Sequence, residues 1–407
     1  DALNDHQFSY RNRVRFRLSA HNSKTLGIDA QKTTRDLPAR RTQSVALAVA
    51  LTLIFALTTG CSSTTSSTTS AEPLSFPEID AAMNTRISKD RLDGAGLLVV
   101  ANGTEYRNTT YGKYRNDTVL PIASASKWLT AATMMTLVDE GRISLDDRVS
   151  TYLPEFTGTT GTATIRQLLS HTSGIAQASC IWEQRQTLET CVRSIATQKP
   201  ASTPGTNFSY GNTSFTVAGR VIEVVTGQSF ESAFESRIAK PLGMSQTRFD
   251  GSYYPTESNP VPAASAESTL DDYGKFVEMI FNKGKLNGVR VLSEHSVLEM
   301  ETDSVKGLNT RSDSAVGTTG IPTYGLGTWR DVTTTDDVGV ITSGNGAYGF
   351  YPWVDRSRNG YGIILVFDQR GSDLAVPESQ RQMHSVWATL DQLGIPRQST
   401  ATTTYGR

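Results

Sequence analysis

The stretch PIASASKWLTAATMMTLVDEG, residues 121–141, decides how we expect this chain to fold. Pro121 follows a β-rich region, and a helical pattern then runs from Ser124 to about Glu140, where a glycine follows. A glycine directly after a periodic apolar stretch is typical of a helix end. The first turn carries Ser124 and Lys127, and residues three apart lie on one face of a helix. We therefore expect a buried helix whose first turn presents a hydroxyl beside an amine.

This Ser-x-x-Lys spacing occurs once in the chain. The positive end of the helix dipole and burial both disfavour a charged ammonium at Lys127. An amine with a lowered pKa can take the Ser124 proton and make the hydroxyl a nucleophile. The backbone N–H of Ser124 can also face a developing oxyanion. The motif by itself leaves open an ordinary N-terminal serine beside a solvated lysine.

A second motif, YGN at residues 210–212, follows a turn-rich Pro-Gly pair. Three other tyrosines begin the same Tyr-x-Asn pattern, but all of them precede Ser124. A phenol near a Ser–Lys pair can relay a proton to a leaving group. We therefore take Tyr210 as a candidate acid/base, and Asn212 as a group that can hold both the substrate and the lysine.

Three further stretches accompany these motifs: IRQLLSHTSG at 165–174, KPLGM at 240–244 and ASAESTLDD at 264–272. Together with the two motifs they resemble the serine β-lactamase and penicillin-binding-protein-like hydrolases, and among these the class C β-lactamase and esterase branch. The resemblance covers about residues 80–393.

The resemblance implies a role for each matching residue. Ser124 would be the acylated nucleophile, Lys127 the base and Tyr210 the second acid/base. Asn212 would be a substrate contact. His171, within the first of the three stretches, would brace a loop and would not act as a general base.

The chain departs from the family at its third motif. The family has Lys-Thr-Gly or His-x-Gly on the strand that lines the site, and neither occurs here. The matching strand ends TSGNG at 342–346. We expect the Ser343 hydroxyl to replace the cation that meets a substrate carboxylate, and Gly344 and Gly346 to allow close backbone approach. A neutral hydrogen bond to a carboxylate is roughly half as strong as a charge-assisted one. This favours an ester or small amide over a β-lactam.

Strand patterns are found at both ends of the folded region and helical patterns between them. The strands are expected at 96–101, 105–111, 325–332, 338–342, 350–354 and 362–367, and helices at 124–140, 215–226, 230–238, 270–282 and 378–393. This order predicts an α+β fold of β-lactamase/DD-peptidase type. An antiparallel sheet would be flanked by helices, with a mainly helical insertion at about 145–320.

The folded hydrolase domain is expected at 74–396, between segments of other character. Residues 1–39 form an N-terminal extension outside the fold, residues 62–73 a Ser/Thr-rich linker, and residues 397–407 a flexible tail. Residues 40–61 resemble an export signal, described next.

In residues 40–61, basic residues precede an apolar run from Val45 to Leu57. The run is shorter than the roughly 20 residues of a membrane-spanning helix and has the features of a secretory signal. Gly60-Cys61 resembles the cleavage site of bacterial lipoproteins, which would make Cys61 a lipidated residue. An uncleaved anchor helix is the alternative. We expect a cell-envelope protein, periplasmic or held to the membrane through this segment.

The remaining cysteines, Cys180 and Cys191, form an even pair, and an exported protein sits in an oxidising compartment. We expect a disulfide that closes a small loop, with two buried free thiols as the alternative. The five histidines are scattered, so no metal site is expected.

The formal net charge of −1 argues against a nucleic-acid partner. The stretch GNGAYG at 344–349 matches G-x-G-x-x-G, but a strand pattern follows it where a dinucleotide-binding loop needs a helix. We expect no cofactor, and a small-molecule ester, amide or peptidoglycan-type substrate. The oligomeric state stays open.

Three functions are compatible with these motifs. The first is an exported serine hydrolase that works through a Ser124 acyl-enzyme. The second is a slowly deacylating penicillin-binding or peptidoglycan-related protein, or a weak β-lactamase. The third is an inactive surface protein that keeps the fold as a scaffold.

Overall fold

The computed structural model describes residues 76–183, 185–250, 259–310, 323–333 and 339–395. The export segment, the Ser/Thr linker and the C-terminal tail expected from the sequence lie outside these residues. Within the described part of the chain, no helix is both long enough and apolar enough to cross a membrane.

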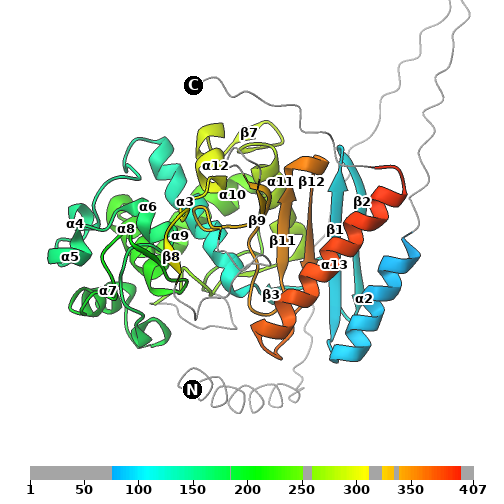
Figure 1. The fold of residues 1–407 in the computed structure, drawn as a ribbon, viewed down its shortest axis with the longest axis horizontal. Helices are drawn as coiled ribbons and strands as arrows, with labels where there is room; N and C mark the ends of the chain where they lie inside the picture. Colours follow the sequence, from blue (N-terminus) through cyan, green and yellow to red (C-terminus); the bar gives the residue numbers. More distant parts are fainter. Residues whose placement is uncertain (1–75, 184, 251–258, 311–322, 334–338, 396–407) are drawn as a thin grey trace, which may run out of the picture. The chain divides into compact units, whose positions relative to one another are not determined.

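A six-stranded antiparallel sheet is the framework of the fold (Figure 1). Its spatial order is β2-β1-β12-β11-β10-β9, so strands from early and late in the chain form one sheet. The strands are β1 Gly94–Ala101, β2 Thr104–Gly112, β9 Trp329–Thr333, β10 Gly339–Ser343, β11 Tyr351–Asp355 and β12 Gly360–Leu365. The predicted α+β fold with a sheet built from both chain ends is confirmed.

The β1–β2 hairpin turns at Asn102-Gly103, between the two strands expected at 96–101 and 105–111. Both residues have positive φ, 50° for Asn102 and 74° for Gly103. A two-residue turn of this kind matches the twist of the flanking strands, and asparagine and glycine adopt it readily.

Strand β1 separates the two layers of the core. Leu97 and Val99 contact the layer that contains α2 (Pro77–Asp90) and α13 (Ser372–Gln392), whereas Leu98 and Val100 face the helical region. The two helices run along one face of the sheet (Figure 1). Helix α2 was not predicted, because only a few of its residues are apolar.

Helix α3, Ser126–Asp139, lies at the centre of the layer on the other face and is buried on nearly all sides. It packs among the helices of the middle of the chain. These are α4 Val149–Tyr152, α5 Gly158–Gly161, α6 Ile165–Leu169, α7 Leu188–Ala196, α8 Thr213–Thr226, α9 Phe230–Phe234, α10 Lys240–Leu242, α11 Leu270–Phe281 and α12 Glu294–Glu301.

Short strand pairs and single turns complete the described structure. The pairs are β3 Leu120–Pro121 with β5 Glu267–Ser268, β4 Asn207–Phe208 with β8 Asn309–Thr310, and β6 Lys285–Leu286 with β7 Val289–Arg290. The turns are η1 Ala123–Ala125, η2 Ser179–Trp182, η3 Glu235–Ala239 and η4 Arg356–Arg358.

Two predicted helices differ from the structure. The helix expected from Ser124 begins two residues later, because residues 123–125 form a 3-10 turn. The helix expected at 230–238 is α9 followed by the π-helical turn η3. Pro241 lacks the N–H that would continue α-helical bonding through this region.

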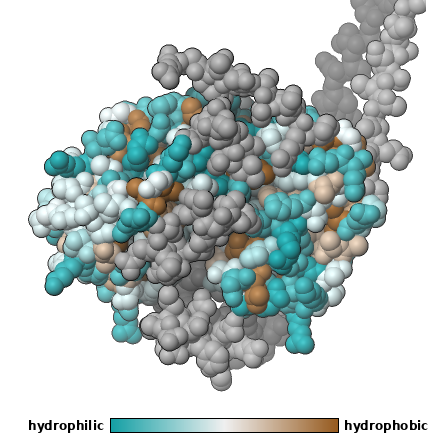
Figure 2. Space-filling view, in the orientation of Figure 1, coloured by the Kyte–Doolittle hydropathy of each residue, from teal (hydrophilic) through white to brown (hydrophobic). Residues whose placement is uncertain are grey.

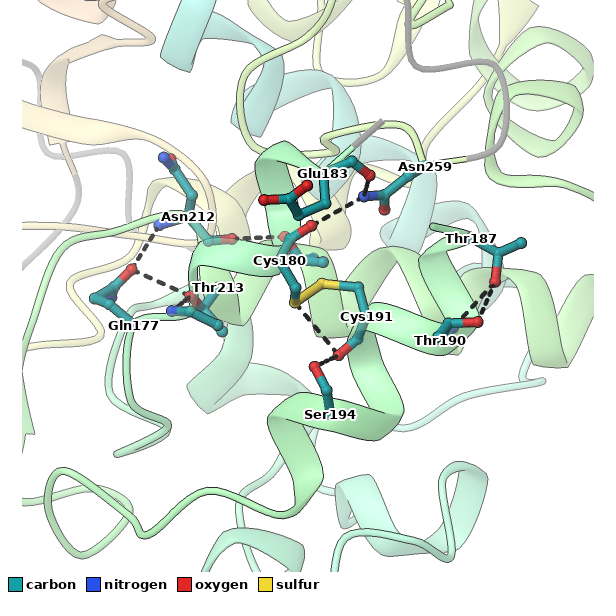
Figure 3. The surroundings of a disulfide bond; sticks show 12 residues. Gln177, Cys180, Glu183, Thr187, Thr190, Cys191, Ser194, Asn212, Thr213 and Asn259 are labelled. Carbon is teal, nitrogen blue, oxygen red and sulfur yellow. Dashed lines mark hydrogen bonds between the residues drawn. A yellow bond between two sulfur atoms is a disulfide. The ribbon is translucent and has the colours of Figure 1, made fainter. Parts of the chain in front are cut away.

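Cys180 and Cys191 form the predicted disulfide, which joins η2 to α7 (Figure 3). On the face shown in Figure 2, apolar side chains are scattered among hydrophilic ones and form no continuous patch over the coloured residues. Isolated apolar side chains are ordinary on a protein surface.

Candidate active site

Ser124 is the middle residue of the 3-10 turn η1. Ala123, directly before it, has a φ of 47°, in the left-handed region that residues other than glycine occupy at a cost. Ser124 is partly exposed, whereas its neighbours on both sides are buried. The turn therefore presents the hydroxyl at the surface of the core while α3 continues inside it.

Lys127, in the first turn of α3, is 1% exposed. Its Nζ donates to Ser124 Oγ at 3.1 Å, to Asn212 Oδ1 at 2.9 Å and to the Ala263 carbonyl oxygen at 3.1 Å. All three acceptors are neutral. Burial lowers the pKa of the amine to about 7. A large fraction of Lys127 is therefore uncharged at neutral pH and can accept a proton.

The segment 262–266 holds the start of α3 in place. The Ala266 N–H donates to Ser126 Oγ at 3.0 Å, and the Ile122 N–H donates to the Ala266 carbonyl at 3.0 Å. These contacts bring the Ala263 carbonyl to Lys127. Sequence analysis singled out part of this segment but missed the carbonyl, because a backbone acceptor has no residue signature.

Tyr210 reaches the same place from the short connection between β4 and α8. Its hydroxyl lies close to the side chains of Ser124 and Trp329. Lys127 Nζ lies 4.7 Å from the centroid of its ring. Removal from water raises the pKa of the phenol to about 12, so Tyr210 carries its proton at neutral pH. The Ser124 hydroxyl, the Lys127 amine and the Tyr210 phenol thus lie close together.

Asn212 precedes α8 and is held by the loop that carries the disulfide (Figure 3). Gln177 Oε1 accepts from the Asn212 N–H at 3.3 Å and from Thr213 Oγ1 at 3.2 Å. A Cβ on Gly211 would lie 2.1 Å from Gln177 Nε2, so a larger residue there would displace the Gln177 amide. Gln177 was not singled out from the sequence, although it lies three residues beyond the stretch 165–174.

His171 packs among aromatic rings beside Tyr210, with ring centroids 4.5 Å apart. Burial, and then the Lys127 charge, hold the pKa of the imidazole well below its usual value, so the ring is neutral. Its Nδ1 lies 3.3 Å from Ser214 Oγ. No contact between His171 and the Ser124 hydroxyl is found among the described residues. The position fits a residue that braces Tyr210.

Gly344 and Gly346 let their strand lie directly on the start of α3. A Cβ on Gly344 would come within 2.6 Å of the Trp128 ring, and one on Gly346 within 2.1 Å of the Ile122 carbonyl oxygen. The N–H groups of both glycines donate to carbonyls of residues 350–352. The two glycines therefore let the backbone come close to Trp128 and Ile122. Their own N–H groups are already bonded to residues 350–352.

Asn345 lies between these two glycines. Its backbone N–H is the one of the three that does not donate to residues 350–352. Successive N–H groups of an extended chain point in opposite directions, so this one points away from β11. No described residue accepts a hydrogen bond from it or from the Ser124 N–H. Sequence analysis missed Asn345. Its position between Gly344 and Gly346 could have indicated it, because N–H groups alternate in direction along an extended chain.

No cluster of three or more His, Cys, Asp or Glu side chains that could hold a metal ion occurs in the part of the chain that the structure describes.

Residues 79–385 match the family model described as Beta-lactamase. This chain belongs to the beta-lactamase family. Members of this family are hydrolases. A solved structure from Bacteroides dorei, assigned to the beta-lactamases, has a TM-score of 0.69 and 30% identity, and covers 76% of this chain and 98% of its own.

Two curated relatives match parts of the chain. Protein flp of Staphylococcus aureus strain COL is 30% identical over 200 residues, which is 45% of this chain and 40% of the relative. Penicillin-binding protein 4 of Amycolatopsis lactamdurans is 35% identical over 174 residues, 39% of this chain and 45% of the relative. The aligned part thus spans less than half the length of either relative.

Within this beta-lactamase-family fold, Ser343 does not point towards α3. It lies opposite Trp353 in the β10–β11 pairing, and directly opposed residues project to one face. Trp353 packs on Trp387 of α13, with ring centroids 5.9 Å apart. The Ser343 hydroxyl lies beside Tyr351 and Asp331 instead. The expectation that Ser343 replaces the missing cation is wrong, because the pleat sends alternate residues to opposite faces.

Proposed function

We propose that this protein is an exported serine hydrolase that cleaves an ester or small amide through an acyl-enzyme on Ser124. One cluster carries the proposal. The Lys127 amine, with a pKa of about 7, lies 3.1 Å from the Ser124 hydroxyl, and the Tyr210 hydroxyl lies close to the same side chain. A hydroxyl in contact with a base and an acid is what nucleophilic acyl transfer requires.

In acylation, uncharged Lys127 takes the Ser124 proton while Oγ bonds to the carbonyl carbon of the ester. The carbonyl electron pair moves to oxygen and forms an oxyanion. As this collapses, the bond between carbon and the leaving oxygen breaks, and that oxygen takes the Tyr210 proton. Tyr210 regains a proton from the Lys127 ammonium. The products are acyl-Ser124 and an alcohol.

The oxyanion is proposed to lie between the N–H groups of Ser124 and Asn345. Neither N–H donates to a described residue, and Gly346 brings the strand against the Ile122 carbonyl, two residues before Ser124. Donors that are already in place bind the oxyanion more strongly than the ground-state carbonyl. In other enzymes, removing one oxyanion-hole donor by mutation costs about 3–4 kcal/mol of transition-state stabilisation.

Deacylation reverses the proton path. A water occupies the place of the alcohol and gives its proton to the Lys127–Tyr210 pair as its oxygen bonds to the acyl carbon. The bond to Ser124 Oγ then breaks, Oγ recovers its proton, and the carboxylic acid leaves. The same two groups therefore serve both half-reactions.

The third motif favours a substrate without a carboxylate. Thr342 lies two residues from Gly344 and shares the face that meets α3. Its Oγ1 is buried without a hydrogen-bond partner among the described residues. A hydroxyl thus stands on this strand where the family has Lys or His. Because neutral donors bind carboxylates less strongly than cations do, a neutral ester suits the site better than a β-lactam.

The second candidate is a slowly deacylating penicillin-binding or peptidoglycan-related protein. The similarity to Penicillin-binding protein 4 favours it. The two candidates differ in turnover. A hydrolase releases product continuously, whereas a penicillin-binding protein gives one stoichiometric burst and then stops.

Export is part of the proposal and rests on residues 40–61, which lie outside the described residues. The disulfide between Cys180 and Cys191 agrees with an oxidising compartment. Lipid attachment at Cys61 would hold the protein at a membrane surface. Metabolic labelling with a fatty-acid analogue, lost in Cys61→Ser, would support this part.

Ser124→Ala tests the mechanism in the full-length chain. We expect loss of p-nitrophenyl butyrate hydrolysis and of labelling by a fluorophosphonate probe, because the acylated atom is gone. Ser229→Ala, at the N-cap of α9, is the matched control and should keep both signals. Unchanged turnover in Ser124→Ala would refute the assignment.

A further inference from the structure

Asn259 is buried, at 0% exposure, and links two segments that meet only in the folded protein. It lies four residues before Ala263, the carbonyl acceptor in the candidate active site. Its Nδ2 donates to the carbonyl oxygens of Cys180 at 3.1 Å and of Glu183 at 3.0 Å (Figure 3). The Asn259 amide thus joins the segment that carries this acceptor to residues 177–183, the disulfide loop.

Residues 259–263 form a stiff connection, because two of the five are prolines, whose rings fix φ. Thr130 Oγ1 of α3 donates to the Pro262 carbonyl oxygen at 2.6 Å, one residue before the carbonyl that accepts from Lys127. The connection therefore lies directly on α3, next to the amine. Few backbone rotations remain to absorb a displacement of its first residue.

The disulfide loop is itself fixed to two helices. The disulfide between Cys180 and Cys191 ties it to α7. The Ala178 N–H donates at 2.9 Å to Oγ1 of Thr213, the first residue of α8. Thr213 directly follows Asn212, whose Oδ1 is the other distant acceptor of the amine. One loop therefore contacts both of the distant segments that supply acceptors to the amine.

We propose that Asn259 is a positioning residue for Lys127. Through its hydrogen bonds to the disulfide loop it holds residues 260–263 against α3, which keeps the Ala263 carbonyl on the amine and keeps water away from it. This inference rests on the proposed serine-hydrolase function, in which Lys127 is the base.

The expected consequence is a change in the strength of the base. Burial lowers the pKa of Lys127 to about 7. If residues 260–263 loosen, water reaches the amine and its pKa rises towards the ordinary value of a lysine. The acidic limb of kcat/KM then moves to higher pH, because more of the amine is charged at each pH. A loss of folded protein would lower kcat/KM by one factor at every pH and leave the limb in place.

The groups around Lys127 were considered as other sources of this limb. Tyr210, with a pKa of about 12, and His171, whose pKa burial holds well below its usual value, both stay neutral near pH 7. Glu231 of α9 accepts from the Phe249 N–H, and burial raises its pKa to about 7. Charged side chains of α8, η3 and α12 form ion pairs, Arg220 with Glu223, Arg237 with Glu140, and Glu299 with Arg166. Glu231 is therefore the group that the experiment must separate from Lys127.

The experiment measures kcat/KM for p-nitrophenyl butyrate between pH 5 and 9 with the wild type and Asn259→Ala. We expect the acidic limb to move up by about half a unit to one unit, which lowers kcat/KM about three- to tenfold on the limb and less on the plateau. No movement of the limb, or a movement to lower pH, would overturn the proposal.

Two control variants should keep the limb of the wild type. Ser379→Ala on α13 also removes buried hydrogen bonds, one from Arg86 and one to the Gly349 carbonyl, but on the other face of the sheet. Glu231→Gln removes the other group with a pKa of about 7. A limb that disappears in Glu231→Gln would belong to that carboxyl and would overturn the proposal.

If Asn259→Ala does not fold, Asn259→Leu keeps a branched side chain of similar size and loses the donors. The same movement of the limb is expected, and its absence would overturn the proposal. The double variant Cys180→Ala/Cys191→Ala tests the disulfide loop, because it releases the loop from α7. Its limb should move in the same direction, and an unmoved limb would contradict the role given to the loop.

Failure of the proposed function would look different from failure of this inference. In the first case Ser124→Ala would still hydrolyse the ester. In the second, Ser124→Ala would be inactive while Asn259→Ala kept the limb of the wild type.

Discussion

Two cations are buried on opposite faces of the sheet, and their surroundings differ. Arg86 of α2 has Nε 3.6 Å from Asp90 and Nη2 3.9 Å from Asp368, and it donates to Ser379 Oγ at 2.8 Å. Lys127 of α3 donates to a hydroxyl, an amide and a backbone carbonyl. One cation is therefore paired with carboxylates, and the other is surrounded by neutral oxygens.

The difference shows how burial can produce either a structural link or a base. Burial lowers the pKa of both groups, but at Arg86 the charges of Asp368, Glu378 and Asp90 oppose this effect. A guanidinium also keeps its proton in proteins. At Lys127 burial acts without such opposition, so the proton is held weakly at neutral pH. Neutral acceptors orient the amine without stabilising its charge as carboxylates would.

Lys127→Met should have the largest effect on catalysis. The variant keeps an unbranched side chain but loses the base, so kcat/KM for an ester should fall about 10²- to 10⁴-fold. Steady-state kinetics would measure this, and thermal melting should show a folded protein. If Lys127→Met kept activity within threefold of the wild type, Lys127 would not be a base and would not differ from Arg86 in this respect.

Arg86→Met should lower the free energy of unfolding and not the catalytic rate. Removing one partner of a buried ion pair typically costs about 3–5 kcal/mol, and we expect the lower end of this range because Arg370 still pairs with Asp90 and Asp368. Denaturant unfolding would measure the free energy. Arg381→Met, at an exposed position on α13, should lose under about 1 kcal/mol. A stable but inactive Arg86→Met would contradict the structural role.

The pH dependence of kcat/KM is the third and smallest of the expected effects, and it tests the contrast between Lys127 and Arg86. Lys127 must be uncharged to take the Ser124 proton, and its pKa is about 7. Activity should therefore rise through pH 7, reach a plateau above it, and fall about tenfold per unit well below it. Tyr210, with a pKa of about 12, stays protonated across this range. A profile flat from pH 5 to 8 would exclude Lys127 as the base.

Features set by neighbouring residues could be predicted from the sequence. The Asn102-Gly103 turn follows from the positive φ that both residues tolerate. The contact between Ser124 and Lys127 follows from their spacing across one helical turn. Cys180 and Cys191 are close in the chain, and their disulfide was expected. Local geometry leaves few alternatives in such cases.

The face to which Ser343 points could not be read from its motif, because a shift of one residue along a strand reverses every side chain. Thr342, its neighbour, faces α3 instead. The structure also supplied Asn259, which lies 79 residues from Cys180 in the chain. No spacing rule connects residues that meet only after the sheet and the helical region have packed.

The sequence determined that a hydroxyl and an amine would share one helix turn and that a tyrosine motif would follow them. Only the tertiary structure decided that the amine holds its proton weakly at neutral pH. The Asn212 and Ala263 acceptors of Lys127 are 85 and 136 residues away along the chain. The lowered pKa of Lys127 arises from the removal of water by segments that converge on α3. Desolvation belongs to the packed core, so no single stretch of the chain encodes it.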